Sequence, residues 1–165
     1  MRLVAIGADS SHLPEFSRRI NALHDAGQTH CRLTKFLALP DPDWPVRADV
    51  DKWIVQAREL GLESTTSMDD ALAQADGVLV LAVNGHRHLD LALPAIRRGL
   101  PTYIDKPLTC SLDQAKQLLT ETRRTGARCY SASSLRFITE LESFDFEAVG
   151  EIVAMAQAAG RGVAK

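Results

Sequence analysis

The residues best suited to hold a charged ligand lie near the start of the chain, in "GADSSH". This loop follows an apolar strand and precedes a helical pattern, which is where a dinucleotide-binding chain carries G-x-G-x-x-G. Only the first glycine, Gly7, is present, and we expect it to permit the tight turn. The N–H groups at a helix start bind anions, and serine hydroxyls add donors. The loop therefore predicts a modified phosphate site, or simply a helix cap; its other candidate residues are Asp9, Ser10, Ser11 and His12.

A second group of polar residues lies at the end of a later strand, in "YIDKPL". Pro107 cannot continue a β-ladder, so the strand ends and Lys106 is displayed at its carboxyl edge beside Asp105. A carboxylate that accepts hydrogen bonds and an ammonium that donates them are thereby placed together. The alternative is a strand-ending turn that carries a solvated lysine.

Two further loops carry candidate binding residues. Asp41 follows the second expected strand, where an acid accepts ribose hydroxyls and favours NAD over NADP. Arg47 in the same loop would instead favour a 2′-phosphate, and a solvated proline-rich loop, Pro40–Asp49, explains both residues equally well. At the end of the strand expected at 77–82, "AVNGHRH" offers Val83, Asn84, Gly85 and His88 to a cofactor. His86 and His88 do not share a helix face, so no metal site is expected.

These loops require an alternating strand–helix framework. Helical patterns lie between the apolar strands expected at 3–6, 32–39, 77–82, 102–105 and 128–131. This alternation predicts an α/β fold, a doubly wound, mostly parallel, Rossmann-like sheet with helices on both faces. Ligands bind such sheets beyond the carboxyl ends of the strands, near the point where the strand order reverses. The loops after Ile6, Ala82 and Ile104 should therefore meet at one edge.

Composition restricts the class of protein. The 19 basic and 21 acidic residues nearly balance and form no basic stripe, so neither nucleic acid nor an anionic membrane is an expected partner. No apolar run is long enough to span a bilayer or to form a signal-peptide core. Three widely separated cysteines fit reduced thiols in a cytoplasmic protein.

The second half of the chain resembles the glucose–fructose oxidoreductase and inositol dehydrogenase family, also called Gfo/Idh/MocA. That family shows H-x-x-x-A-x-x-A-x-x-x-G, then a strand with E-K-P, and later R-F. Asp105-Lys106-Pro107 replaces E-K-P, and Val83-Asn84-Gly85 replaces the usual T-P-N. The spacings and the later pair are kept by His88, Ala92, Ala95, Gly99 and Arg136-Phe137.

The resemblance implies binding of NAD or NADP, with a slight preference for NAD, and hydride transfer to or from a sugar, a polyol or a related hydroxy compound. Lys106 would exchange the proton of the substrate oxygen, because partial burial lowers a lysine pKa toward working pH. Asp105 would hold Lys106 or the nicotinamide ribose, and Arg136 would lie on the substrate side. The resemblance also implies that the Lys106–Pro107 bond is cis.

The resemblance also predicts the domain organisation. We expect a dinucleotide-binding domain over residues 1–135 and, over 136–165, a linker and the first strand of a truncated or absent α+β domain. That strand, expected within Gly150–Gly160, would leave an unpaired edge and offers a route to a homo-oligomer. Two rivals are a non-catalytic nucleotide- or partner-binding module and a methyltransferase that uses S-adenosylmethionine.

Overall fold

A computed structural model describes residues 1–39, 41, 49–137 and 139 of the chain. The chain forms two compact units, Met1–Ser133 and Ser134–Lys165. In the second unit, the described residues include one short 3₁₀-helix, Ser134–Phe137. Arg47 and the strand expected within Gly150–Gly160 lie outside the described residues.

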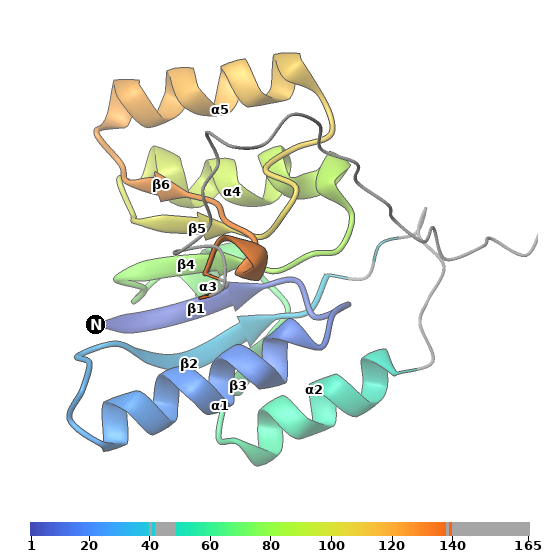
Figure 1. Ribbon diagram of the computed structural model, residues 1–165, viewed down its shortest axis with the longest axis vertical. Helices are drawn as coiled ribbons and strands as arrows, with labels where there is room; N and C mark the ends of the chain where they lie inside the picture. Colours follow the sequence, from blue (N-terminus) through green and yellow to red (C-terminus); the bar gives the residue numbers. More distant parts are fainter. Residues whose placement is uncertain (40, 42–48, 138, 140–165) are drawn as a thin grey trace, which may run out of the picture. The chain divides into compact units, whose positions relative to one another are not determined.

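The first unit is built on a single sheet in which all six strands are parallel (Figure 1). The spatial order is β3-β2-β1-β4-β5-β6, so the chain crosses from one half of the sheet to the other between β3 and β4. This is the doubly wound, Rossmann-like arrangement that the alternating pattern predicts. The strands are β1 (Arg2–Ile6), β2 (Arg32–Leu37), β3 (Glu63–Thr65), β4 (Gly77–Val80), β5 (Thr102–Ile104) and β6 (Cys129–Tyr130).

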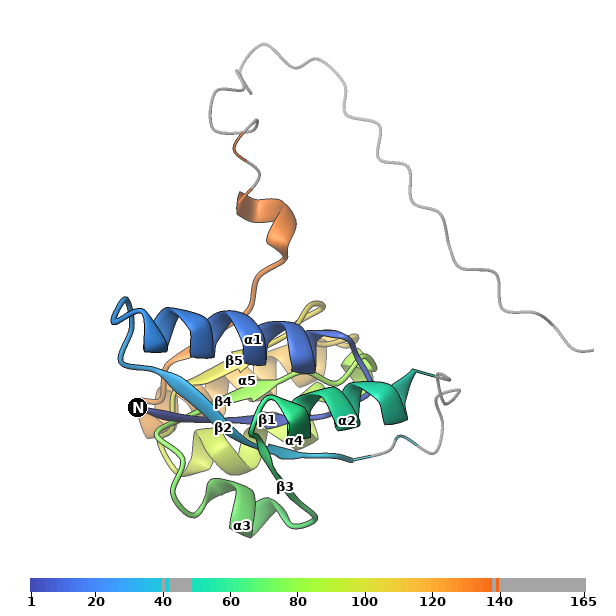
Figure 2. The same ribbon diagram turned by 90° about the horizontal axis from the view of Figure 1, so that it is seen from below.

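Helices pack on both faces of the sheet because each carries one apolar side. In α1, for example, Leu13, Phe16 and Ile20 recur at helical spacing and pack in the core on one face. Figure 2 shows α1 and α3 on opposite sides of the sheet. None of the helices in the described ranges is long and apolar enough to cross a membrane. The helices are α1 (His12–Asp25), α2 (Val50–Glu59), α3 (Met68–Leu72), α4 (His88–Arg97) and α5 (Leu112–Thr125).

The strand register brings three loops level with one another. Ile6 pairs with Val80, and Val80 pairs with Ile104, at the carboxyl ends of β1, β4 and β5. Beyond these pairs, the Leu81 N–H donates to the Ile6 carbonyl at 2.8 Å, and the Asp105 N–H donates to the Val80 carbonyl at 2.9 Å. The three loops expected to meet at one edge therefore begin side by side.

Two local expectations differ from the structure. The strand β3 was not predicted, because two of its three residues, Glu63 and Ser64, are exposed and no apolar run marks it. The S-x-x-Q spacing of Ser111 and Gln114 at the start of α5 is typical of a capping box, but no such box forms, because Ser111 makes no side-chain cap. The Gln114 amide instead donates to the His86 carbonyl at 3.1 Å.

Candidate functional site

Gly7 makes the tight turn that its position predicts. Its φ of +94° lies in the left-handed region, and a Cβ added to it would stand 2.7 Å from the Ala82 nitrogen. The backbone of the first loop therefore passes directly against the end of β4, where no side chain would fit. Gly7 also donates its N–H to the Leu37 carbonyl at 2.9 Å, which ties the turn to β2.

Asp9 links the first loop to the loop after β4. Both of its carboxylate oxygens lie 3.3 Å from the Val83 backbone nitrogen, whose N–H they accept. Asp9 occupies the position of the second glycine of the G-x-G-x-x-G motif. Its half-buried carboxylate connects the loop after β1 to the loop after β4.

The two serines at the start of α1 differ in their contacts. Buried Ser10 accepts the His12 N–H on its Oγ at 2.9 Å, so its side chain satisfies a backbone donor at the start of α1. Exposed Ser11 occupies the N-cap position but forms no side-chain cap. Within the described residues, the N–H groups of Ser10 and Ser11 have no hydrogen-bond acceptor. These donors and the Ser11 hydroxyl are therefore free to bind an anion at this helix start.

His12 reaches across the sheet edge to the third loop. Its Nδ1 lies 2.5 Å from Oδ2 of Asp105, and Oδ1 of Asp105 accepts the Lys106 N–H at 2.8 Å. Burial raises the pKa of the Asp105 carboxyl, but the His12 and Lys106 hydrogen bonds outweigh it and leave that pKa below its ordinary value. The His12 ring stacks on Phe16, with centroids 5.4 Å apart.

A cavity of about 140 Å³ lies where these loops converge. Both buried Asp105 and exposed Lys106 line it. The partial burial expected of Lys106 is wrong, because this side chain is exposed. The Lys106–Pro107 peptide bond is cis, as the resemblance implies. The cavity is lined by Ser10, Ser11, His12, Val83, Asp105 and Lys106.

His88 does not line this cavity and is fully buried. Its Nδ1 is 2.7 Å from the Pro107 carbonyl, and its Nε2 is 2.7 Å from the Ala82 carbonyl. A neutral imidazole donates to only one of these acceptors, whereas the protonated ring donates to both. The ring thereby joins the end of β4 to the loop that carries Lys106, and both of its nitrogens are engaged.

Asn84 and Gly85, in the loop after β4, contact neighbouring loops. The Asn84 amide donates to the Asp41 carboxylate at 2.7 Å, and Asp41 is only 7% exposed. A Cβ added to Gly85 would stand 2.8 Å from the Cys110 sulfur and 2.9 Å from Cγ of Pro107. Asp41 is thus turned toward the loop after β4, and Gly85 allows that loop to pack on the loop after β5.

A second hollow, of about 240 Å³, is lined by Ala8 and Asp9 of the first loop. It extends from the first loop over the end of β2 to the start of α2. The acidic residue at its α2 side is Asp51, which the sequence interpretation missed because no strand end or motif marks it. Its apolar lining consists of Ala8, Ala38, Leu39, Val50 and Ile54.

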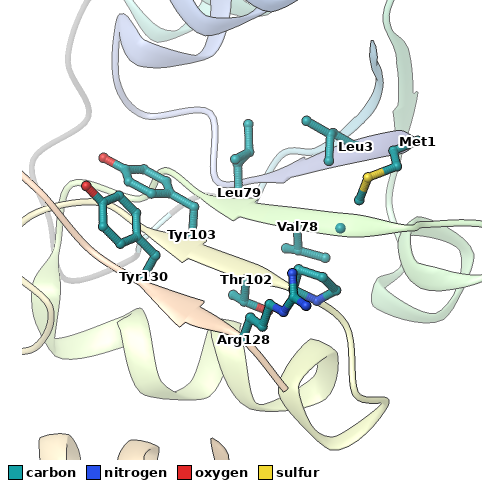
Figure 3. A pocket seen from close by; sticks show the side chains of 10 residues that line it. Met1, Leu3, Val78, Leu79, Thr102, Tyr103, Arg128 and Tyr130 are labelled. Carbon is teal, nitrogen blue, oxygen red and sulfur yellow. The ribbon is translucent and has the colours of Figure 1, made fainter. Parts of the chain in front are cut away.

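A third hollow, of about 220 Å³, lies away from these loops (Figure 3). Figure 3 shows Leu3, Leu79, Tyr103 and Tyr130 along one side of the strands. Apart from the amino group of Met1, the ionisable groups of its lining are Arg128 and the two tyrosines. Because it includes the amino-terminal ends of β4 and β5, it does not share the edge where the candidate residues gather.

Arg136, the candidate on the substrate side, is exposed and belongs to the second unit. Among the described residues, no group of three or more His, Cys, Asp or Glu side chains gathers at a spacing that could hold a metal ion. Cys31, Cys110 and Cys129 are free thiols.

Comparison with solved structures supports the same fold. An NAD-binding oxidoreductase from Klebsiella pneumoniae superposes with a TM-score of 0.60 at 22% identity, over 80% of this chain and 34% of that one. The WlbA dehydrogenase from Bordetella pertussis, solved with NADH and UDP-GlcNAcA, gives a TM-score of 0.63 at 19% identity, over 86% and 39%.

Sequence comparison identifies the family. The scyllo-inositol 2-dehydrogenase (NAD(+)) of Bacillus subtilis strain 168 is 28% identical over 83 residues, or 49% of this chain and 24% of that protein. The chain thus spans about a quarter of that relative's length. A family model described as "Oxidoreductase family, NAD-binding Rossmann fold" matches residues 2–133. The chain therefore belongs to the Gfo/Idh/MocA family of oxidoreductases, as a member of its NAD-binding Rossmann part.

Proposed function

We propose that the chain forms the NAD(P)-binding half of an oxidoreductase that acts on a sugar, a polyol or a related hydroxy compound. The observation that carries this proposal is that two cavities share the first loop: Asp9 lines one of them, and the next residues, Ser10 to His12, line the other. One is lined mostly by apolar residues between β2 and α2, and the other is polar and contains Lys106. A dinucleotide laid across the first loop would place its adenosine in the first cavity and its nicotinamide end in the second.

The start of α1 fits the pyrophosphate between these cavities. Gly7 brings the backbone close, and the free N–H groups of Ser10 and Ser11 face no competing acceptor within the described residues. The Asp9 carboxylate is already engaged by the Val83 N–H, which offsets part of its charge. Val83 then lines the nicotinamide end, while Asn84, Gly85 and His88 hold the surrounding loops in place.

Two acidic residues, Asp41 and Asp51, are candidates for the contact with the adenosine ribose. Asp41 is turned toward Asn84, whereas Asp51 lines the adenosine cavity directly. A carboxylate in this cavity favours the two free ribose hydroxyls of NAD and repels the 2′-phosphate of NADP. The preference for NAD is therefore proposed to rest on Asp51 rather than on Asp41.

The chemistry at the nicotinamide end follows from Lys106. When bound, the dinucleotide supplies a hydride acceptor or donor for a carbon that bears oxygen. The exposed Lys106 ammonium donates a hydrogen bond to that oxygen and orients it. Asp105 accepts the Lys106 N–H and thereby holds the loop after β5 in place. Arg136 is proposed to contact the substrate. Residues 1–135 would form this cofactor domain, and 136–165 would begin a second domain.

Calorimetric titration with NADH, comparing two serine variants, tests this function. Ser11→Glu adds a carboxylate where the pyrophosphate would lie, and we expect it to weaken NADH binding by about tenfold or more. Ser111→Glu is the matched control, because Ser111 is also an N-cap without a side-chain cap on a 14-residue helix. Equal affinities for the two variants, or no NADH binding by the folded chain, would contradict the proposal.

A non-catalytic dinucleotide-binding module is the second candidate. The carboxylate at the second glycine position and the exposure of Lys106 favour it. Such a module would bind NADH but would reduce no NAD⁺ with scyllo-inositol or other cyclic polyols. Absorbance of newly formed NADH distinguishes the two functions.

A further inference from the structure

His12 and Asp105 form a carboxylate–imidazole pair at the edge of the polar cavity. Nδ1 of His12 lies 2.5 Å from Oδ2 of Asp105. An ionised carboxylate only accepts hydrogen bonds, so the proton of a neutral His12 ring lies on Nδ1. The opposite ring nitrogen, Nε2, then carries the lone pair and is the basic atom of the side chain.

Several contacts hold this pair in one orientation. Asp105 is 6% exposed, and its second oxygen is bound by the Lys106 N–H at 2.8 Å. Phe16 stacks on the His12 ring and itself meets Tyr103 edge-on, with centroids 6.0 Å apart. A buried carboxylate fixed in this way orients the ring and stabilises the imidazolium that forms when Nε2 gains a proton.

His12 lines the polar cavity and is partly exposed. Within the described residues, Nε2 of His12 makes no hydrogen bond. The His12 side chain is 38% exposed and lines the same cavity as Lys106. A substrate oxygen held by Lys106 would therefore lie in a space that His12 also borders.

We propose that His12, positioned by Asp105, is an acid–base residue for the substrate hydroxyl. This inference rests on the proposed function and assigns to His12 a role other than phosphate contact. In the oxidation direction, the O–H proton passes to Nε2, and the O–H electron pair forms the second C–O bond. The carbon loses its hydrogen with the bonding pair to the dinucleotide, and a carbonyl product remains. In reduction, the His12 imidazolium returns the proton.

Reaction with diethyl pyrocarbonate, mapped by peptide mass spectrometry, tests this assignment in the full chain. The reagent modifies a histidine nitrogen that is accessible and carries a lone pair. We expect fast modification of His12 that saturating NAD⁺ suppresses, because the nicotinamide end would fill the cavity. Asp105→Asn should slow this modification by roughly tenfold or more, because an amide no longer fixes the Nδ1–H tautomer.

His24 is the matched internal control. Its Nδ1 lies 3.2 Å from the Asp25 carboxylate, and its side chain is 35% exposed, which is close to the value for His12. It lines neither the polar nor the adenosine cavity. Its modification should respond neither to NAD⁺ nor to Asp105→Asn.

Long-range ¹H–¹⁵N spectra give a second measurement that needs no altered Asp105. With His12 assigned through His12→Gln, the neutral ring should show the Nδ1–H tautomer. The Nε2–H tautomer, or a His12 that NAD⁺ leaves as reactive as before although calorimetry shows NAD⁺ bound, would overturn the assignment. Absence of NAD⁺ binding in calorimetry would instead overturn the proposed function, and the acid–base role with it.

Discussion

The buried ring of His88 joins the end of β4 to the loop after β5: its Nδ1 lies 2.7 Å from the Pro107 carbonyl, and its Nε2 lies 2.7 Å from the Ala82 carbonyl. These carbonyls belong to two of the three loops that converge on the polar cavity. The relative position of Val83 and Lys106, which line that cavity, therefore depends on a histidine that does not line it.

His88→Ala should lower the free energy of unfolding by about 3 kcal/mol, because it removes a fully buried ring together with its hydrogen bonding to the Pro107 and Ala82 carbonyls. Urea unfolding followed by circular dichroism measures this loss. His86→Ala is the control, because His86 is exposed two residues away and its side chain makes no hydrogen bond to the described residues. Similar losses for the two variants would contradict the role of His88.

Gly7→Ala should destabilise the chain by about 3 kcal/mol or more, because the new Cβ meets backbone and the residue must keep a positive φ. Gly27→Ala isolates the second effect. Gly27 also has a positive φ, of 70°, but a Cβ there would meet nothing within 4 Å. It should therefore cost only about 1 kcal/mol. Chemical unfolding of both variants tests the difference, and equal losses would show that the contact with Ala82 is unimportant.

Asp105→Asn should alter how stability depends on pH. The pKa of Asp105 in the folded chain lies below its ordinary value of 3.8, so its ionised form stabilises the fold above that value. This stabilisation is lost as the pH falls through the lower pKa of the folded state. At pH 7 the variant should be about 2 kcal/mol less stable, because charged hydrogen bonds are lost.

Urea unfolding at a series of pH values tests this prediction, since the difference between Asp105→Asn and the unaltered chain should shrink in acid. Asp113→Asn serves as the control, because the Asp113 side chain is 94% exposed and should contribute little. A difference that stays constant down to the lowest pH would contradict the prediction.

The Tyr103 phenol should lose its proton only at unusually high pH. Burial, together with the nearby Asp105 carboxylate, raises the pKa of Tyr103 from 10.0 to about 12. The protonated phenol therefore adds stability below pH 10.0, and this contribution is lost as the pH rises through about 12. The chain has two tyrosines, so ultraviolet titration of Tyr103→Phe and Tyr130→Phe separates them. The phenol ionisation near pH 12 should persist only in Tyr130→Phe. Its persistence in Tyr103→Phe would refute the assignment to Tyr103.

Much of the architecture could be predicted from the sequence because its signals are local. Alternating strands and helices imply a parallel sheet, and the carboxyl ends of parallel strands share one edge. The meeting of the loops after Ile6, Val80 and Ile104 follows from this rule alone. The turn at Gly7 was likewise predictable, because its conformation depends on one residue type at a strand end.

Individual side-chain partners could not be predicted, because they depend on contacts between distant loops. His12 and Asp105 are 93 positions apart, and no pattern in either loop indicates that they meet. Asp41 was expected to bind a ribose, but its carboxylate accepts a hydrogen bond from Asn84, which lies 43 positions further along the chain. The exposure of Lys106 likewise depends on the shape of the folded surface rather than on the D-K-P sequence.

Amide chemical-shift mapping with NADH reports both whether the dinucleotide binds and where. We expect shifts concentrated at Ser10, Ser11, Val83 and Lys106 and, at the adenosine end, at Ile54. Little change is expected around the hollow of Figure 3, at Gly77, Thr102 and Arg128. Shifts confined to that hollow, or a spectrum unchanged by millimolar NADH, would contradict the claim that the carboxyl edge of this sheet holds a dinucleotide.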